Sequence, residues 1–182
     1  MSQIVVQKFG GTSVQTLDRM RHVARIVKRT LQHKKVIVVV SAMAGETDRL
    51  LELGANFIVN SSNMCARELD SLVSTGEQVS ASLLSLALQE IGVPAKSFLS
   101  HQVKIVTSDE FNSARIQQIE FKNLLECLNN GIVPVVAGFQ GIDQEGNITT
   151  LGRGGSDTTA VALAGALKAI FPEVTCEIFT DV

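Results

Sequence analysis

The chain has 182 residues, of which 45% are hydrophobic and 19% are charged, and its formal net charge is −2. These values are typical of one soluble globular domain that is large enough to bury a sizeable core. The weak negative charge gives no electrostatic reason to expect a nucleic acid or an anionic membrane as partner. A chain without Trp or Tyr also has few rings on which bases could stack.

The cysteines and the N-terminus indicate a cytoplasmic protein. Cys65, Cys127 and Cys176 are widely spaced, odd in number and without a CxxC pair, which argues against a disulfide framework and against a zinc site. The chain enters a strand-like run without a signal-peptide layout, and no apolar run approaches the length of a membrane span. We therefore expect a reducing compartment and no set of side chains dedicated to a metal.

The first forty residues predict a complete β-α-β unit. Ile4 to Phe9 reads as a buried strand, and Val36 to Val40 is apolar throughout, which is typical of a parallel sheet covered on both faces. Between them a helix is expected from about Thr16 to His33. One face of this helix carries apolar residues at helical spacing: Leu17, Met20, Val23, Ala24, Val27 and Leu31.

The remaining chain continues the alternation of helices and strands. Helical sequence is expected from about Asp48 to Ile91, broken near Asn60–Asn63 and again, or restarted, at Gly76. The segments expected after it are strands at Ala95–Leu99 and Lys104–Thr107, a helix at Ile116–Leu128, a strand at Ile132–Ala137, a hairpin-like turn within Gln140–Thr150, a helix at Ser156–Ile170 and a strand at Cys176–Asp181. The order predicts the α/β class, as a three-layer αβα sandwich with a mainly parallel sheet.

Polar and glycine-rich stretches follow the predicted strands. They are Lys8–Ser13, Ser41–Thr47, Gly138–Gly141 and, beyond the hairpin, Gly152–Asp157. Ligands of open α/β sheets bind beyond the C-terminal ends of the strands, so we expect these four loops to form one site.

Lys8 is the most informative residue of the first loop. A lysine near the end of an apolar strand is costly unless it has a partner, and Gly10 and Gly11 could offer backbone amides to phosphate oxygens. The alternative is a lysine that reaches solvent at the edge of the sheet. The chain contains neither GxxxxGK[ST] nor GxGxxG, which excludes a Walker-type P-loop and disfavours a dinucleotide site.

The last loop has the composition of an anion site. Arg153 has a guanidinium that suits a carboxylate or a phosphate, and Ser156 and Asp157 are good N-cap residues for the helix that follows. The alternative is a tight turn with a surface arginine. In the same way, Glu77 could be an exposed helix carboxylate and Thr47 a plain N-cap.

Four motifs together resemble the aspartokinases, within the amino acid kinase family, over the whole chain and in the family's order. They are Lys8-Phe9-Gly10-Gly11-Thr12-Ser13-Val14, Val40-Ser41-Ala42-Met43, Ser74-Thr75-Gly76-Glu77 and Thr150-Leu151-Gly152-Arg153-Gly154-Gly155-Ser156-Asp157-Thr158-Thr159-Ala160. The first and last are the most specific, because the family's kinases for glutamate, N-acetylglutamate and UMP look different there.

This resemblance implies ATP-dependent phosphorylation of the β-carboxylate of L-aspartate, giving 4-phospho-L-aspartate. That reaction is the first step towards lysine, threonine, methionine and diaminopimelate, and it uses ATP with Mg²⁺. The implied catalytic residues are Lys8 and Asp157. The implied ATP and phosphate site comprises Lys8, Phe9, Gly10, Gly11, Ser13, Phe179, Thr180 and Asp181, and the implied substrate site comprises Ser41, Thr47, Glu77, Arg153, Gly154, Gly155 and Ser156.

The resemblance also implies individual roles. Lys8 would neutralise charge on the transferring phosphoryl group, and Asp157 would hold Lys8 in place. Arg153 would bind the α-carboxylate of aspartate, and Glu77 its α-ammonium group.

Family members continue beyond the match to Val182 with the rest of the nucleotide site and usually two ACT regulatory domains. We therefore expect residues 1–182 to be the N-terminal part of a catalytic domain, with an exposed apolar sheet edge, weak ATP binding and poor turnover by themselves. The full-length protein is expected to form homo-oligomers. Two alternatives stay open, namely a kinase for another carboxylate and a non-catalytic segment that keeps the fold.

Overall fold

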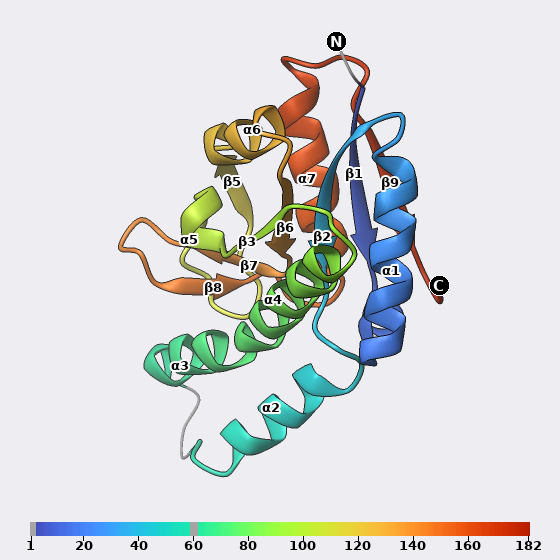
Figure 1. Cartoon of the computed structure of the whole chain (residues 1–182). Coiled ribbons are helices and arrows are strands. Elements are labelled where there is room, and N and C mark those ends of the chain that lie inside the picture. The colour runs from blue at the N-terminus through green and yellow to red at the C-terminus, as the bar shows by residue number, and fades with distance from the viewer. Residues whose placement is uncertain (1–2, 59–61) are drawn as a thin grey trace.

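A computed structural model describes residues 3–58 and 62–182 of the chain. Its centre is a five-stranded sheet with the strand order β3-β6-β2-β1-β9, in which every neighbouring pair is parallel (Figure 1). The strands are β1 (Ile4–Phe9), β2 (Lys35–Val40), β3 (Ala95–Phe98), β6 (Val133–Ala137) and β9 (Thr175–Phe179). The prediction of an α/β protein with a mainly parallel sheet is confirmed.

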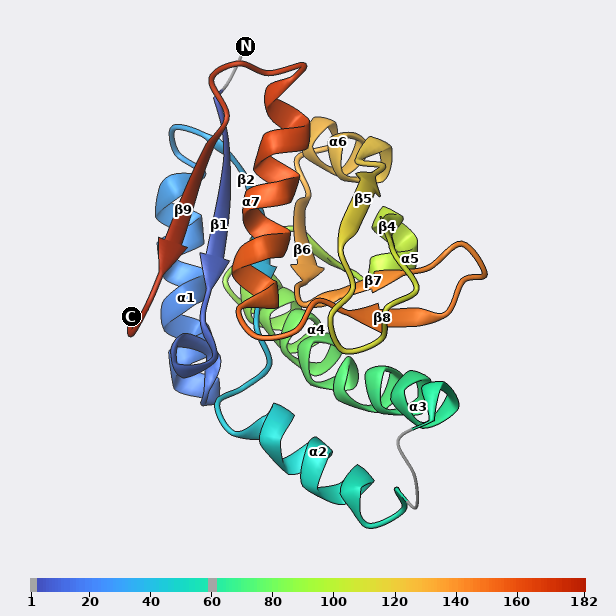
Figure 2. The same ribbon diagram turned by 180° about the vertical axis from the view of Figure 1, so that it is seen from behind.

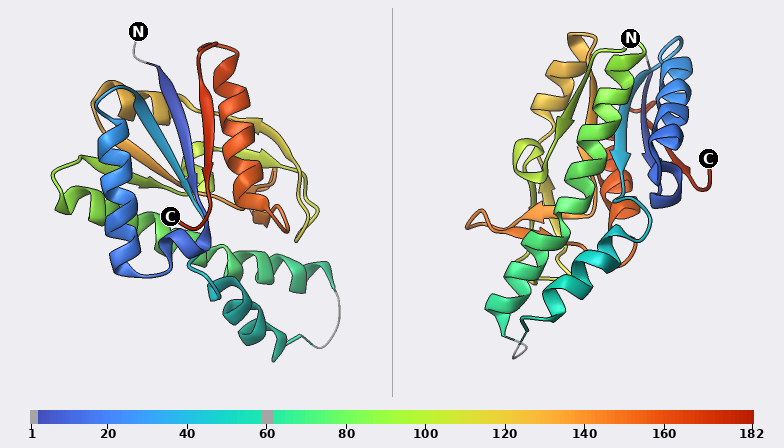
Figure 3. Two further views of the ribbon diagram at one scale, coloured as in Figure 1. Left: turned by 90° about the vertical axis from the view of Figure 1, so that its right-hand side faces the viewer. Right: turned by 60° about the horizontal axis from the view of Figure 1, so that its bottom comes forward.

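Helices cover both faces of this sheet, as the views from front, back and side show (Figures 1, 2 and 3). One face is covered by α1 (Leu17–Thr30) and α4 (Thr75–Glu90), and the other by α6 (Lys122–Asn129) and α7 (Gly155–Lys168). Two further helices, α2 (Glu46–Ala55) and α3 (Asn63–Val73), extend away from the sheet at its lower end (Figure 1). The expected break near Asn60–Asn63 lies partly outside the described residues.

Side-chain alternation along the strands creates two cores. In β1, Val5 and Phe9 point toward α1 and α4, whereas Ile4 and Val6 point toward α6 and α7. All four side chains are buried, as expected for a strand with helices on both sides. Lys8 has the parity of Ile4 and Val6, so its side chain faces α7.

A second sheet, with the strand order β5-β4-β7-β8, lies beside the main sheet and was not predicted as a unit. Its strands are β4 (Ile105–Thr107), β5 (Ile116–Ile119), β7 (Gln140–Ile142) and β8 (Ile148–Thr150). Strands β7 and β8 form the antiparallel hairpin that the sequence predicts within Gln140–Thr150. A short helix, α5 (Ser100–Val103), precedes β4 and was not predicted.

The predicted helix over Ile116–Leu128 is wrong in its first part, which forms strand β5. A bulge explains the error: β4 pairs Val106 with Gln118 but Thr107 with Ile116, so one residue of β5 is skipped. The extra residue lets Ile116 and Ile119, three apart, both pack against the α6–α7 core. This spacing imitates a helix although the backbone is a strand.

Smaller corrections concern helix boundaries. The spacing predicts Leu17 on the buried face of α1, but its side chain is 56% exposed. Gly45 and Gly154, both in the left-handed region, cap α2 and α7. Thr47, Ser156 and Asp157 therefore lie in the first turns of these helices and are not their caps. None of the helices in the described part of the chain combines the length and the hydrophobicity that crossing a membrane requires.

Helix α4 carries residues of the candidate site, so its attachment to the sheet can be tested separately. Leu84→Ala should lower the free energy of unfolding by about 2–5 kcal/mol, because Leu84 is fully buried between α4 and the sheet. Leu86→Ala, on the exposed face of the same helix, should change it by less than about 0.5 kcal/mol. Urea unfolding of both variants measures the difference, and equal losses would contradict this packing.

Candidate active site

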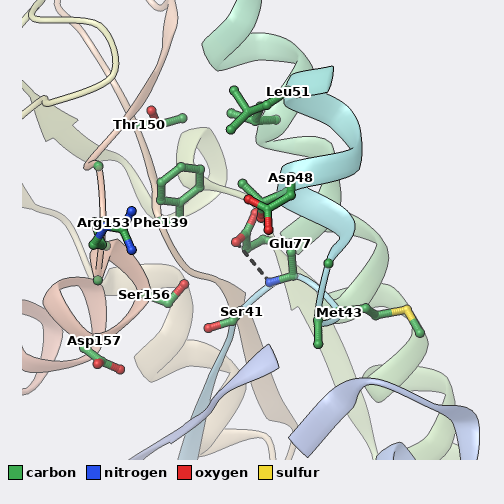
Figure 4. A pocket seen from close by; sticks show the side chains of 18 of the residues that line it. Ser41, Met43, Asp48, Leu51, Glu77, Phe139, Thr150, Arg153, Ser156 and Asp157 are labelled. Carbon is green, nitrogen blue, oxygen red and sulfur yellow. Dashed lines mark hydrogen bonds between the residues drawn. The ribbon is translucent and has the colours of Figure 1, made fainter. Parts of the chain in front are cut away.

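A cleft of about 510 Å³ opens at the C-terminal ends of the central strands. Helix α7 and the loop before it form one wall, and α2 with the start of α4 forms the other (Figure 4). The structure brings the following expected residues together in this cleft: Lys8, Ser41, Thr47, Glu77, Arg153, Gly154, Gly155, Ser156 and Asp157. The four loops therefore meet at one edge of the sheet, as the order of the strands requires.

Lys8 forms an ion pair with Asp157 in the first turn of α7. The Lys8 Nζ lies 2.6 Å from the Asp157 Oδ1, and the lysine is 7% exposed whereas the aspartate side chain is half-exposed. The lysine does not extend into solvent, so that alternative is wrong. The ammonium group of Lys8 borders the cleft and is held in place by the carboxylate of Asp157. It can therefore interact with an anion that enters the cleft.

The other expected phosphate residues lie beside the cleft. The Gly10 amide donates a hydrogen bond to the Phe179 carbonyl at 3.2 Å, so it is already used. A Cβ atom at Gly10 would lie 3.6 Å from the Lys8 Nζ, so the glycine keeps the space beside the ammonium group free. Gly11 packs its backbone closely against the loop after β2, where a Cβ atom would lie 2.8 Å from the Ala42 oxygen.

The last residues of the chain run along the loop that follows β1. The rings of Phe9 and Phe179 stack with centroids 4.7 Å apart, and Phe9 is buried in the core. The Thr12 hydroxyl donates to Asp181 at 2.8 Å, and the buried Ser13 hydroxyl accepts a hydrogen bond from the Val182 amide at 3.4 Å. Thr180 is exposed. This group forms a surface next to Lys8 and outside the cleft.

Glu77 is 3% exposed, so the alternative of an exposed helix carboxylate is wrong. Its Oε1 accepts a hydrogen bond from the Ala42 amide at 3.0 Å, and its Oε2 has no hydrogen-bond partner among the residues that the structure describes. Burial raises the pKa of Glu77 to about 7, against the opposing effect of the Ala42 hydrogen bond. A cationic group in the cleft would satisfy the free oxygen and favour the charged form.

Gly76 allows Glu77 to reach the loop after β2. A Cβ atom at Gly76 would lie 2.8 Å from the Ala42 Cβ, so only glycine permits this close contact without a shift. The expected helix break at this point is confirmed, because α3 ends at Val73 and α4 begins at Thr75, with Ser74 between them.

Arg153 lies on the wall opposite Glu77 (Figure 4). Gly152 and Gly154 on either side of it have φ of 75°, a conformation that glycine adopts without strain. Arg153 is exposed and forms no ion pair with any residue of the described ranges 3–58 and 62–182. Its guanidinium is thus available to an anionic ligand.

The sequence did not single out four residues that also line the cleft: Asp48, Leu51, Val73 and Asn112. Phe139, which lies in the predicted loop Gly138–Gly141, also lines the cleft, and its φ of 70° is uncommon for a bulky residue. Asn112 comes from a loop distant in the sequence, and no local pattern indicates it.

The cleft presents groups of both signs at separate positions. Lys8 and Arg153 suit anionic groups, and Glu77 suits a cation, so a small amphoteric molecule matches the arrangement. Within the described part of the chain, no three or more His, Cys, Asp or Glu side chains are grouped as they would be to hold a metal ion.

Comparisons with known proteins show which family the chain belongs to. The model of the amino acid kinase family matches residues 3–182. An aspartokinase of Pseudomonas aeruginosa is 54% identical over 180 residues, and an aspartate kinase of Stutzerimonas stutzeri is 52% identical over 180 residues. Each match covers 98% of this chain and 42% of the relative, so the chain spans less than half the length of these relatives.

Solved structures show the same likeness. The crystal structure of aspartate kinase from Synechocystis is 53% identical with a TM-score of 0.77, and the match covers 98% of this chain and 28% of that one. Aspartokinase III of E. coli in complex with aspartate and ADP is 32% identical with a TM-score of 0.79, and the match covers 98% of this chain and 49% of that one.

The pKa of Glu77 predicts how stability depends on pH. Between its ordinary value of 4.5 and its folded value of about 7, the folded chain holds a proton that the unfolded chain releases. The free energy of unfolding should therefore fall as the pH rises through this window, by about 3 kcal/mol. Glu77→Gln should remove this fall, which urea unfolding at a series of pH values measures.

Glu46→Gln is the matched control on the neighbouring helix. A hydrogen bond from Arg49 lowers the pKa of Glu46, so its charge contributes fully above its ordinary value of 4.5 and stays constant through the window. This variant should keep the fall in stability. An unchanged slope in Glu77→Gln would contradict the burial of that carboxylate.

Proposed function

Because the chain belongs to the amino acid kinase family, we propose that it is the N-terminal part of a catalytic domain that phosphorylates the β-carboxylate of L-aspartate with ATP. The observation that carries this proposal is that the Lys8–Asp157 pair borders the same cleft as Glu77 and Arg153. Such a cleft can orient an amino acid by its α-groups while its second carboxylate approaches an ammonium group. The bound aspartate and ADP of the similar E. coli enzyme support the same ligands here.

The two α-groups of aspartate have separate partners in this proposal. Arg153 binds the α-carboxylate through its planar pair of N–H donors, and the free Oε2 of Glu77 binds the α-ammonium. Ser41 and Thr47 line the cleft between these groups and add hydroxyl hydrogen bonds. The side of the cleft at α7 is formed by Gly154, Gly155 and Ser156.

Lys8 acts on the phosphoryl group. Phosphoryl transfer depends on positioning and on neutralising the charge of the transferring group, and the ammonium of Lys8 supplies positive charge at the sheet edge. Asp157 holds this ammonium in one orientation from the start of α7. The substrate carboxylate is ionised at neutral pH and is already a nucleophile, so no side chain has to remove a proton from it.

ATP approaches from the side of Gly10, Gly11, Ser13 and the segment Phe179–Asp181, which lies directly beside Lys8. The buried ring of Phe9 supports this surface from below through its stacking on Phe179. When bound with the nucleotide, Mg²⁺ neutralises phosphate charge and is held mainly by the phosphate oxygens.

The pathway and the assembly belong to the same proposal. The product is 4-phospho-L-aspartate, which feeds lysine, threonine, methionine and diaminopimelate synthesis in the cytoplasm. The whole protein forms homo-oligomers through parts beyond the matched region. A kinase for another carboxylate is the competing assignment, but Glu77 disfavours substrates whose amine is blocked, because they lack the cation that its free oxygen requires.

The first test measures ATP turnover by the full gene product with aspartate, glutamate and N-acetylglutamate. Aspartate should be the preferred acceptor, and Lys8→Ala should lower kcat by at least about a hundredfold, because charge on the transferring group loses its partner. Lys34→Ala is the matched control, since Lys34 is also paired with a carboxylate, that of Glu177, but lies outside the cleft. Equal effects of the two variants would refute the role of Lys8.

The second test uses the pKa of Glu77. Because burial raises this pKa to about 7, the carboxylate is increasingly protonated below that pH and loses its attraction for the α-ammonium. The KM for aspartate should rise about tenfold per pH unit as the pH falls below about 7. Steady-state kinetics between about pH 5 and pH 8 measure this dependence.

Glu77→Gln serves as the comparison in the same pH series. It should show a high KM that no longer depends on pH in this range, while the KM for ATP stays unchanged. A KM for aspartate in the unmodified protein that stays constant across the range would remove Glu77 from the ammonium site.

A further inference from the structure

Asp70 is a second buried carboxylate close to the cleft, and the proposed function does not use it. It lies on the last turn of α3, is fully buried and does not line the cleft itself. A buried carboxylate is costly unless hydrogen bonds satisfy both of its oxygens. The partners of Asp70 therefore indicate what it holds in place.

Those partners are two backbone segments that do line the cleft. The Asn112 amide donates to both oxygens of Asp70, at 3.1 and 3.0 Å. Thr150 donates to it through its amide at 2.7 Å and through its hydroxyl at 2.8 Å. One carboxylate thus joins the end of β8 and a distant loop to helix α3.

The same contacts lead to Arg153. The Ala114 amide donates to the Thr150 carbonyl at 2.9 Å, and a Cβ atom at Gly152 would lie 3.0 Å from the Asn112 oxygen, so the two segments pack backbone against backbone. Arg153 follows Gly152 directly. Moving Asn112 or Thr150 would therefore move the guanidinium.

The contacts on the other side lead to Glu77. Helix α3 continues through Ser74 into α4, which carries Glu77 in its first turn. The Ser74 carbonyl accepts a hydrogen bond at 2.9 Å from the buried Gln140 side chain, and Gln140 pairs with Thr150 in the β7–β8 hairpin. The junction of the two helices is thus tied to the hairpin at two points, by Asp70 and by Gln140.

We propose that Asp70 is a positioning residue that sets the span between Glu77 and Arg153, and thereby the preference for a ligand with both an α-ammonium and an α-carboxylate. This inference rests on the proposed function, because it assigns those two groups to aspartate. A fixed span favours a ligand that bridges both groups and does nothing for a ligand that contacts only one of them.

Ligands that carry only one of the two α-groups can test this proposal in the full gene product. Succinate lacks the α-ammonium and β-alanine lacks the α-carboxylate, so each can contact only one side of the span. We define the aspartate advantage as the ratio of the inhibition constant of either analogue to the KM for aspartate. Asp70→Ala should reduce this advantage by about tenfold or more, with little change in the KM for ATP, because the span is no longer fixed.

Asp70→Asn should keep the advantage close to that of the unmodified protein. The side-chain oxygen of the asparagine can accept hydrogen bonds from the Asn112 and Thr150 amides, and its side-chain NH2 group can donate one to the Thr150 hydroxyl. Asp70→Asn could also lose as much of the advantage as Asp70→Ala does. The charge of Asp70, and not its hydrogen bonds, would then be responsible, which would overturn the proposal.

Asp143→Ala is the matched control for general destabilisation. Asp143 is also buried and accepts hydrogen bonds from the Glu145 and Asn147 amides, but at the tip of the hairpin and away from the cleft. It should lower Tm and leave the aspartate advantage unchanged. A loss of the advantage in this control as large as in Asp70→Ala would overturn the proposal.

Gln140→Leu provides a second variant if Asp70→Ala does not fold. It removes the other tie at Ser74 with a side chain of similar size, and it should reduce the advantage in the same direction. If the unmodified protein does not phosphorylate aspartate, the proposed function fails. If it does, but Asp70→Ala or Gln140→Leu keeps its full advantage, only the present inference fails.

Discussion

The ion pair between Lys8 and Asp157 is the contact on which the geometry of the cleft depends. An ammonium group at the end of a buried strand is costly without an anion, and the first turn of α7 supplies one at 2.6 Å. Because this turn directly follows the glycine-rich loop, the pair fixes the start of α7 against the end of β1 and brings Arg153 to the same cleft. Segments from opposite ends of the chain thus form one site.

Close packing at glycines holds each wall of the cleft against the end of a central strand. A Cβ atom at Gly138 would lie 2.8 Å from that of Ser156, and one at Gly155 would lie 2.7 Å from the ring of Phe139. Gly76 has the same role on the opposite wall. Since interiors are close-packed, added methyl groups at these points would push whole elements apart, which explains why the loops combine glycine with small polar residues.

The sequence predicts the parts of this site that local patterns specify. Apolar runs identify the parallel strands, and the polar loops that follow them, including Lys8 and Arg153, must then meet at one edge. Non-local contacts are not visible in such patterns. Strand β5 was missed because a bulge gives its isoleucines helical spacing. Asp70 and Asn112 were missed because they meet only after distant segments fold together.

The two buried carboxylates near the cleft differ in what satisfies them, and this difference separates support from recognition. The hydrogen bonds from Asn112 and Thr150 satisfy both oxygens of Asp70 within the folded chain, whereas Glu77 keeps one oxygen without a partner among the described residues. In the function that we propose, the α-ammonium group of the ligand would be the partner of this oxygen and a blocked amine would not, so Asp70 supports the site and Glu77 recognises the ligand.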